Sequence, residues 1–164
     1  MPLVTLTENQ IQMAHVETER LITDSNTRGL QHRFDPTKSA VYRYENHFQA
    51  AVSEIAVSTF LGLPWTSTQS FKGSDVSGYE VRSQKRKDGK QYCLLVRGND
   101  KTAIYIFCVV DTPNVVISGW ATDYEVRNNG VLLYEDTDCY GLRREELHPM
   151  WQLDEVTEFA SRHA

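Results

Sequence analysis

The chain has 164 residues, of which 40% are hydrophobic and 24% are charged. This length allows one domain with its own core and is short for two, and the composition is that of a globular chain and not of a disordered one. With 17 basic against 22 acidic residues, the net charge of −5 gives no global sign of nucleic-acid binding, so any such binding must rest on a local patch.

The sequence contains no apolar run of the length that spans a membrane and no secretory signal pattern at its N-terminus, so we expect a cytoplasmic protein without a membrane partner. Its three cysteines, Cys93, Cys108 and Cys139, form no C-x-x-C pair and are expected to be buried thiols. The histidines show no metal-ligand spacing, and no glycine-rich phosphate-binding motif occurs. These observations argue against a zinc site, an acyl-enzyme hydrolase and a simple nucleotide-binding site.

The first predicted element is a helix that begins with a capping box at Thr7 and continues to Asp24. We expect its acidic residues, Glu17 among them, to lie on a solvated face. Residues 25–44 show little periodicity and are predicted to form a loop that carries a short strand at residues 40–42.

The strongest helical pattern covers residues 46–63, with a wide apolar stripe and a stop at Gly62 and Pro64. Glu54 projects from a second face of this helix, where its neighbours at helical spacing are small or apolar. A carboxylate in such surroundings is costly unless it is paired or binds a metal. The side chain of Glu54 therefore either reaches the surface or pairs with an arginine, or it is a candidate ligand in a functional site.

Residues 69–90 contain the main candidate site. Asp75 and Glu80 stand on either side of a Ser-Gly turn, and Arg82 follows Glu80 by two positions. If residues 79–83 form a strand, its two-residue period places Glu80 and Arg82 on one face and the apolar residues on the other. A tight bend would bring the oxygens of Asp75 and Glu80 close enough to share a divalent cation such as Mg²⁺.

The same stretch continues into a basic run formed by Lys85, Arg86, Lys87 and Lys90. These side chains are candidates to grip DNA phosphates, an attraction that weakens as salt is added. The alternative is a polar hairpin tip that is charged for solubility alone. Under strict alternation Lys85 does not share the face of Glu80, so it would need a bulge to reach the acids.

The second half of the chain predicts an α/β fold. Two nearly continuous apolar runs, at residues 92–97 and 103–110, are typical of central strands covered on both faces. With the strand at residues 79–83 and a further one at residues 115–120, they are expected to form a central mixed sheet of about four to five strands flanked by helices. The remaining predictions are a short helix at residues 121–129, a strand at residues 140–142 and a C-terminal helix at residues 154–163.

Asp75 and the triplet Glu80-Val81-Arg82 resemble the core motif of the PD-(D/E)XK, or restriction-endonuclease-like, nuclease family. Residues 46–153 resemble small phage or prophage members of that family. The resemblance implies that the two acids hold Mg²⁺ and that the preceding helix adds a glutamate, here Glu54. The chain departs from the family motif at Arg82, which stands where the family has the lysine that orients the attacking water, and at Ser74, which replaces a proline.

By this resemblance, residues 1–164 form a single nuclease-like domain. Residues 1–45 would form an N-terminal helix and loop, residues 46–153 the core, and residues 154–164 the C-terminal helix. The expected function is metal-dependent hydrolysis of DNA phosphodiester bonds, with Mg²⁺ or Mn²⁺ as cofactor.

In this reaction Asp75, Glu80 and Glu54 would hold the metal, while Arg82 would bind the scissile phosphate or brace Glu80. Arginine is always charged and has a planar fork of donors, so it is not equivalent to the lysine of the motif. The alternative function is therefore a catalytically inactive protein of the nuclease fold that binds nucleic acid or a host protein. DNA is the expected partner, and a homodimer is a further association left open.

Overall fold

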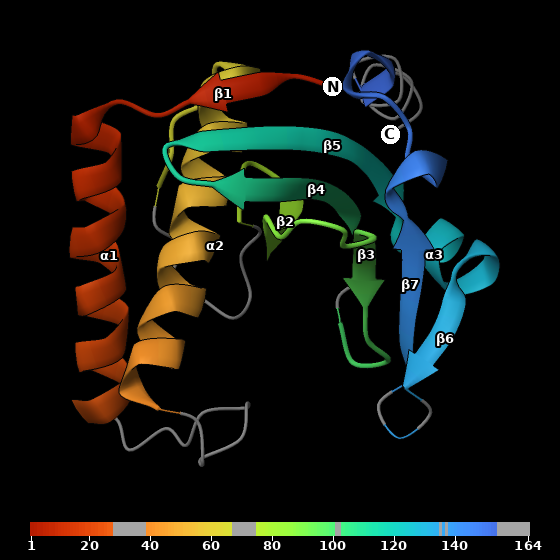
Figure 1. Cartoon of the computed structure of the whole chain (residues 1–164), viewed down its shortest axis with the longest axis horizontal. Coiled ribbons are helices and arrows are strands. Elements are labelled where there is room, and N and C mark those ends of the chain that lie inside the picture. The colour runs from red at the N-terminus through yellow and green to blue at the C-terminus, as the bar shows by residue number, and fades with distance from the viewer. Residues whose placement is uncertain (28–38, 67–74, 101–102, 135, 137, 154–164) are drawn as a thin grey trace.

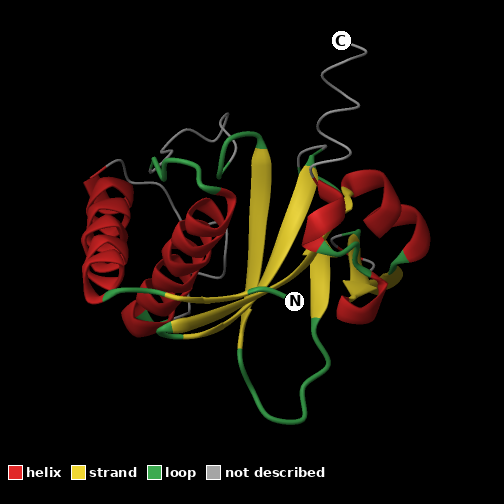
Figure 2. Cartoon of the chain, turned by 90° about the horizontal axis from the view of Figure 1, so that it is seen from above, coloured by secondary structure: helices red, strands yellow, loops and turns green. Residues whose placement is uncertain are grey.

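The computed structural model describes residues 1–27, 39–66, 75–100, 103–134, 136 and 138–153, and shows a layered α/β molecule (Figure 1). Of the two long helices, α2 (Ala40–Leu61) packs along one face of a sheet, and α1 (Glu8–Thr27) packs on the side of α2 away from that sheet. A second, smaller sheet and a short helix lie on the opposite face, as the view from above shows (Figure 2). The predicted α/β class with a mixed central sheet flanked by helices is confirmed.

The central sheet has the strand order β1-β5-β4-β2. Its strands are β1 (Leu3–Thr5), β2 (Tyr79–Lys85), β4 (Ile104–Asp111) and β5 (Asn114–Thr122). β2 runs parallel to β4, while β4 with β5 and β5 with β1 are antiparallel. Because β2 is the last strand in this order, the segment that carries the acidic motif lies at one edge of the sheet.

The second sheet has the order β3-β7-β6, formed by β3 (Cys93–Val96), β7 (Cys139–Arg143) and β6 (Val131–Tyr134), and α3 (Asp123–Asn129) packs beside it. The prediction that residues 92–97 form a central strand is therefore wrong. Leu94 and Val96 are fully buried, whereas Cys93 and Leu95 are only partly buried, so β3 has one covered face. A short apolar run indicates a strand but does not say which sheet the strand joins.

The start of α2 also differs from the prediction, because residues 40–44 belong to this helix and do not form a loop with a short strand. The hydroxyl of Ser39 accepts a hydrogen bond from the Tyr42 backbone N–H over 3.2 Å, which caps the helix. The Tyr44 hydroxyl forms a hydrogen bond of 2.7 Å with His15 of α1, and the His15 ring stacks on Phe48. These contacts with α1 override the strand preference of the aromatic and β-branched residues in the first turn. The predicted stop at Gly62 is confirmed, since this residue closes α2 with a φ of 67°.

Alternation along the central strands divides the core in two. On one face Val81, Ile106 and Ile117 pack with Val52 and Ile55 of α2. On the other face a second cluster packs against the small sheet and α3, and it consists of Leu94, Val96, Tyr105, Phe107, Val109, Ala121, Val126 and Leu142. The central sheet is thus covered on both sides, as its apolar strands require.

Other predictions fall at the ends of the chain or concern single residues. Cys108 and Cys139 are buried thiols as predicted, while Cys93 is only partly buried. The predicted helix at residues 154–163 lies outside the described residues. Among the described helices, none combines the length and the apolar character that crossing a membrane would require.

Candidate active site

The bend between Asp75 and Glu80 is present. An isolated antiparallel bridge joins Val76 to Tyr79, and the two residues between them have positive φ values, 41° at Ser77 and 98° at Gly78. Glycine tolerates such a conformation, which allows the chain to reverse within two residues. The turn brings Asp75 back onto the start of β2, where its Oδ2 accepts a hydrogen bond of 2.8 Å from the Val81 backbone N–H.

The two faces of β2 are those that the sequence predicts. Val81 belongs to the core cluster under α2, whereas Glu80 and Arg82 are in register with Tyr105 and Phe107, which face the small sheet. Glu80 is 5% exposed. A carboxylate at such a depth needs a positive partner or a ligand.

Arg82 is the cation that joins the acids of this site. Its Nη1 lies 3.7 Å from Glu80 Oε2 and 3.9 Å from Asp75 Oδ2, and its Nη2 lies 3.6 Å from Asp100 Oδ2. Its guanidinium carbon lies 5.1 Å from the centre of the Tyr105 ring, within the range of a cation–π contact. In the structure Arg82 thus forms an ion pair with Glu80.

Glu54 is electrostatically linked to the same acids. Burial is the main cause that raises the pKa of Glu54 to about 8, and the negative charge of Asp75 acts in the same direction, with smaller contributions from Glu17 and Glu80. The indole Nε1 of Trp65 donates a hydrogen bond of 3.2 Å to Glu54 Oε2, which acts in the opposite direction. With a pKa of about 8, Glu54 is mostly protonated at neutral pH, and a cation bound beside it would lower that pKa and displace the proton into water.

Glu17 also faces inward, so the prediction that it lies on a solvated face is wrong. It is 8% exposed and forms a short ion pair with Arg20 one turn along α1. Because α1 packs on α2, this carboxylate is close enough to Glu54 to raise its pKa. Packing between the two helices, which a helical pattern does not reveal, accounts for the difference.

Asp75, Glu80 and Asp100 thus gather around one arginine, while Glu54 of α2 is linked to Asp75 and Glu80 only through their negative charges. Carboxylate oxygens are the ligands that Mg²⁺ and Mn²⁺ prefer, so the chemistry of Glu54, Asp75 and Glu80 fits a hard divalent cation. The arrangement does not yet form a metal centre: within the described residues, no group of three or more His, Cys, Asp or Glu is placed to hold a metal ion. The guanidinium of Arg82 lies within 4 Å of both Asp75 and Glu80 in its place.

The basic run lies at the other end of β2. Lys85 ends the strand, and the exposed side chains of Arg86, Lys87 and Lys90 belong to the connection that leads to β3. Lys85 follows Glu80 by five positions, which corresponds to about 17 Å along a strand. No register shift interrupts the pairing of β2 with β4, so the bulge that would turn Lys85 toward the acids is absent from this described strand.

The basic connection is nonetheless held in place. The Arg86 backbone N–H donates to Val110 O over 2.8 Å, and the Arg86 side chain pairs with Asp111 at 3.3 Å. The Tyr92 hydroxyl accepts from the Lys87 N–H at 2.8 Å and donates to the Lys87 carbonyl at 2.9 Å. These bonds present the cations on a fixed backbone.

Between the acids and the basic run, Gln84 shares the face of Glu80 and Arg82. Its side-chain oxygen Oε1 is buried and has no hydrogen-bond partner within the described part of the chain. Buried polar atoms are paired in most native structures, so an unpaired one next to a candidate site is a suitable acceptor for a bound group.

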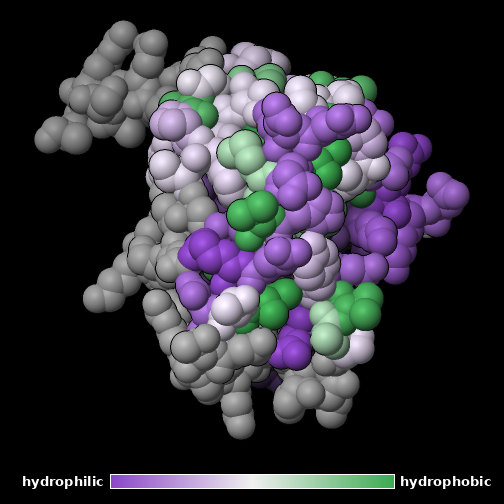
Figure 3. Space-filling model, turned by 90° about the vertical axis from the view of Figure 1, so that its left-hand side faces the viewer, coloured by the Kyte–Doolittle hydropathy of each residue, from purple (hydrophilic) through white to green (hydrophobic). Residues whose placement is uncertain are grey.

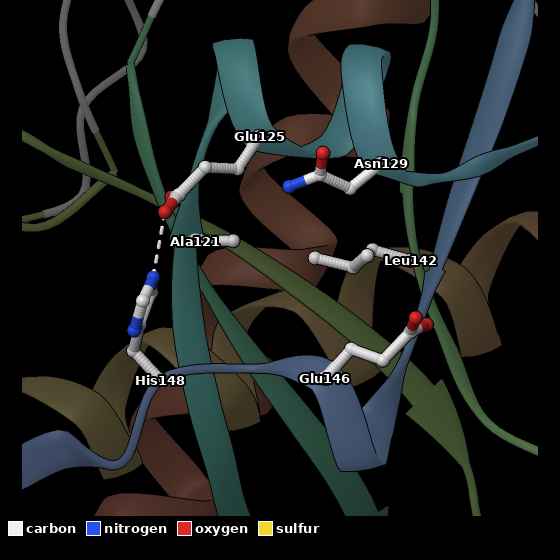
Figure 4. Close-up of a pocket in the computed structure, with 6 residues that line it drawn as sticks. All are labelled: Ala121, Glu125, Asn129, Leu142, Glu146 and His148. Atoms are coloured by element: carbon white, nitrogen blue, oxygen red, sulfur yellow. Dashed lines mark hydrogen bonds and ion pairs between the residues drawn. The ribbon is translucent and has the colours of Figure 1, made fainter.

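A cavity of about 310 Å³ lies away from the acids, between α3, β7 and the end of β5 (Figure 4). Its most polar pair is Glu125 and His148, whose Oε1 and Nε2 are 2.6 Å apart. The other Glu125 oxygen accepts from the N–H and the hydroxyl of Thr122, each at 2.8 Å, in the capping box of α3. Because both oxygens of Glu125 are engaged, we assign this cavity a structural role and not a catalytic one.

A more open groove of about 430 Å³ is lined by residues of α1 and by Trp65. The side of the molecule that α1 covers is shown in Figure 3, where polar surface surrounds small apolar areas. Met13 and Val16 are exposed there, and Trp65 and Glu17 also line the groove. Trp65 and Glu17 both influence the pKa of Glu54. The groove that they line is therefore next to Glu54.

Three residues of the site are not predicted by the sequence. Trp65 lies beyond the end of α2, eleven positions after Glu54. Only the folded turn after the helix brings the two side chains together. Asp100 belongs to an Asn-Asp turn, where an acid is expected for the turn alone. Tyr105 stands in an apolar run, and its register with Glu80 depends on a parallel pairing of strands far apart in sequence.

Comparison with known proteins adds no relative: no protein-family model, no curated protein and no solved structure matches the chain. The site itself is therefore the basis for inferring a function.

Proposed function

We propose that the protein is a metal-dependent nuclease that hydrolyses DNA phosphodiester bonds in the cytoplasm. The observation that supports this function best is the pairing of Asp75 and Glu80 with one arginine, with the buried carboxyl of Glu54 close enough for the charges of both acids to raise its pKa. Stability alone does not favour such a cluster, because each buried carboxylate costs free energy unless it is compensated. A buried acid with a raised pKa beside further acids, as Glu54 is, is typical of sites that bind or transform a ligand.

In this proposal Asp75 and Glu80 would hold Mg²⁺ or Mn²⁺, with Glu54 as a third carboxylate. A bound divalent cation supplies a more acidic water and neutralises charge on the phosphodiester. The guanidinium of Arg82 contacts the aromatic ring of Tyr105 and the carboxylate of Asp100. In this position it would bind a phosphate of the substrate. The exposed cations Lys85, Arg86, Lys87 and Lys90 would bind phosphates farther along the strand.

The alternative is a catalytically inactive protein of the nuclease fold that binds nucleic acid or a host protein. One observation favours it: Arg82 pairs with three carboxylates and so compensates for the acids without a metal. In that case the basic connection after β2 would carry the binding, and the acids would only fix the shape of the edge strand.

Cleavage assays separate the two functions. Purified protein should be incubated with single-stranded, nicked and supercoiled DNA in Mg²⁺, in Mn²⁺ and in EDTA. We expect cleavage that depends on the metal and falls by about 100-fold or more in Glu80→Gln, the scale on which one charge-stabilising group acts in catalysis.

The matched control is Glu45→Gln, which changes an exposed glutamate of α2 and should cleave like the wild type. Equal cleavage by Glu80→Gln would show that the site is placed wrongly. Absence of both cleavage and a metal-induced rise in melting temperature would replace the nuclease with the binding protein.

A further inference from the structure

The outer strand of the small sheet presents an apolar edge. All four side chains of β6 are exposed, with exposed fractions of 58% at Val131, 41% at Leu132, 45% at Leu133 and 59% at Tyr134. No charged residue and no proline interrupts this strand. Figure 1 shows β6 on the outer side of the sheet, beyond β7.

An open strand edge of this kind is unusual in a protein that acts alone. In the part of the chain that the structure describes, β6 pairs with β7 and with no other strand, so its outer row of N–H and C=O groups has no strand partner. Natural proteins guard such edges with lysine, proline or a covering segment, because another strand can add to them. The apolar side chains of β6 offer no such guard.

We propose that β6 pairs with β6 of a second copy of the chain, antiparallel and around a two-fold axis, so that the two small sheets become one continuous sheet. This interface does not depend on the proposed nuclease activity. The partner is another molecule of the same protein, because the strand is complementary to itself.

Symmetry explains the choice of partner. In an antiparallel pair related by a two-fold axis, one residue faces its own copy, and here that residue is Leu132 or Leu133. Apolar side chains then meet apolar side chains on both sides of the axis. This two-sided match fails for a partner strand of alternating polar residues.

The charges at the ends of β6 favour the antiparallel direction. Asp136 and Asp138 are exposed beyond the C-terminal end of the strand. Antiparallel pairing moves the acids of the two copies to opposite ends of the joined strands. Parallel pairing would set the acids side by side, which is unfavourable in a chain with a net charge of −5.

The expected dimer is weak, because four strand residues and their neighbours form a patch well below the usual 20–30 residues per side. Sedimentation velocity should therefore be measured on the full chain from about 1 μM to about 1 mM, the range of weak association. We expect the sedimentation coefficient to rise from that of a monomer to that of a dimer.

Leu132→Lys is the decisive variant, because it adds a charge to the edge, whereas Leu133 also packs over Gly141 of β7. It should remain a monomer throughout the range. The control Val41→Lys changes an apolar residue of α2 with 68% exposure and should dimerise like the wild type. A wild-type chain that stays monomeric, or a Leu132→Lys chain that dimerises equally well, would overturn the proposal.

A cross-linking experiment tests the register of the β6–β6 pair and introduces no charge into the strand. Leu132→Cys and Leu133→Cys should be oxidised separately, and one of them should form a disulfide-linked dimer faster than Val41→Cys. The native cysteines are the same in all three samples, so they form a common background. If neither strand variant exceeds the α2 control, the two-fold pairing is incorrect.

Discussion

The indole Nε1 of Trp65 donates a hydrogen bond to Glu54 Oε2 across 3.2 Å, so a residue beyond the C-terminal end of α2 fixes a carboxylate in the middle of that helix. This bond gives a buried acid a defined direction. It also compensates for only a small part of the cost of burial, since the pKa of Glu54 still rises to about 8. Trp65 thus positions the carboxyl group of Glu54, and no positive charge among the causes of its pKa shift offsets the effect of burial.

The raised pKa of Glu54 predicts how stability depends on pH. Between about 4.5 and about 8, the folded protein holds a proton on Glu54 that the unfolded chain has lost, so the free energy of unfolding falls as the pH rises. Glu54→Gln should remove this decline and stabilise the protein at pH 9 by a few kcal/mol, because a tenfold change in proton affinity corresponds to about 1.4 kcal/mol. Urea denaturation in EDTA at several pH values measures the effect.

Glu45→Gln, on the exposed side of the same helix, is the control for the helix itself. Its stability should follow the wild type at every pH. If Glu54→Gln shows the same pH slope as the wild type, Glu54 does not hold the extra proton.

Arg82 should compete with divalent cations for Asp75 and Glu80. Arg82→Ala leaves these acids and Asp100 without their common partner, so it should destabilise the protein by about 1–3 kcal/mol, between the cost for an exposed pair and that for a buried one. Mn²⁺ should restore much of the lost melting temperature and bind more tightly than to the wild type. Calorimetric titration with Mn²⁺ measures the affinity.

Arg82→Lys is the matched variant, since it keeps the charge but removes the planar fork. We expect it to lie between the wild type and Arg82→Ala in stability, and to cleave DNA at least as fast as the wild type. Metal binding that is unaffected by both substitutions would show that the cation does not share the acids with Arg82.

The connection after β2 predicts a salt-dependent interaction with DNA. Replacing Lys85, Arg86 and Lys87 with alanine should weaken binding and reduce the slope of log affinity against log salt by about 1 for each phosphate that the variant no longer neutralises. Without the exposed Arg86–Asp111 pair, stability should change by no more than about 1 kcal/mol. Fluorescence anisotropy with labelled DNA at several salt concentrations measures the affinity and its slope, and urea denaturation measures the stability.

The control for charge alone is a double replacement of Arg97 and Arg143, which are exposed outside this connection. It should change the salt slope less than the triple variant does. An unaltered slope in the triple variant would identify the basic run as a solvated loop.

Glu125 should stabilise the contact between α3 and the segment around His148. Burial acts on its carboxyl, but the hydrogen bonds from Thr122 and His148 prevail and lower its pKa. The carboxylate therefore contributes stability above its unfolded pKa, and this contribution is lost as the pH falls through the folded pKa. Glu125→Ala should cost about 1–2 kcal/mol at pH 7, the scale of a lost cap, as measured by urea denaturation.

Glu125→Gln keeps an acceptor for the Thr122 N–H and removes the charge. Its stability should be closer to that of the wild type and should change less between pH 6 and pH 3. A Gln variant that loses stability in acid as steeply as the wild type would exclude Glu125 as the source of the effect.

The sequence predicts the local parts of the site better than its assembly. The faces of β2 follow from a two-residue period, and the turn at Ser77 and Gly78 follows from residues that accept a positive φ. The apolar neighbours of Glu54 in a helix mark it as a candidate site residue, but they leave open whether its side chain reaches the surface. Each of these predictions uses residues within a few positions of one another.

What the sequence does not predict depends on distant pairing. The parallel register of Glu80 with Tyr105 joins segments separated by β3, and the small sheet takes β3 away from the central one. The extra turn of α2 at Ala40 depends on a stack with His15 of another helix. Apolar periodicity contains no information on which partner a strand or a helix end will find.

The straight, unbulged course of β2 has a consequence for any DNA that follows it. The strand fixes the distance between its acids at one end and its cations at the other, which is about 17 Å. Along a duplex this length corresponds to about five base pairs at 3.4 Å each. Under the proposed nuclease function, a cut made at the acids would therefore fall at a constant offset from the phosphates that the cations would bind, whatever the sequence in between.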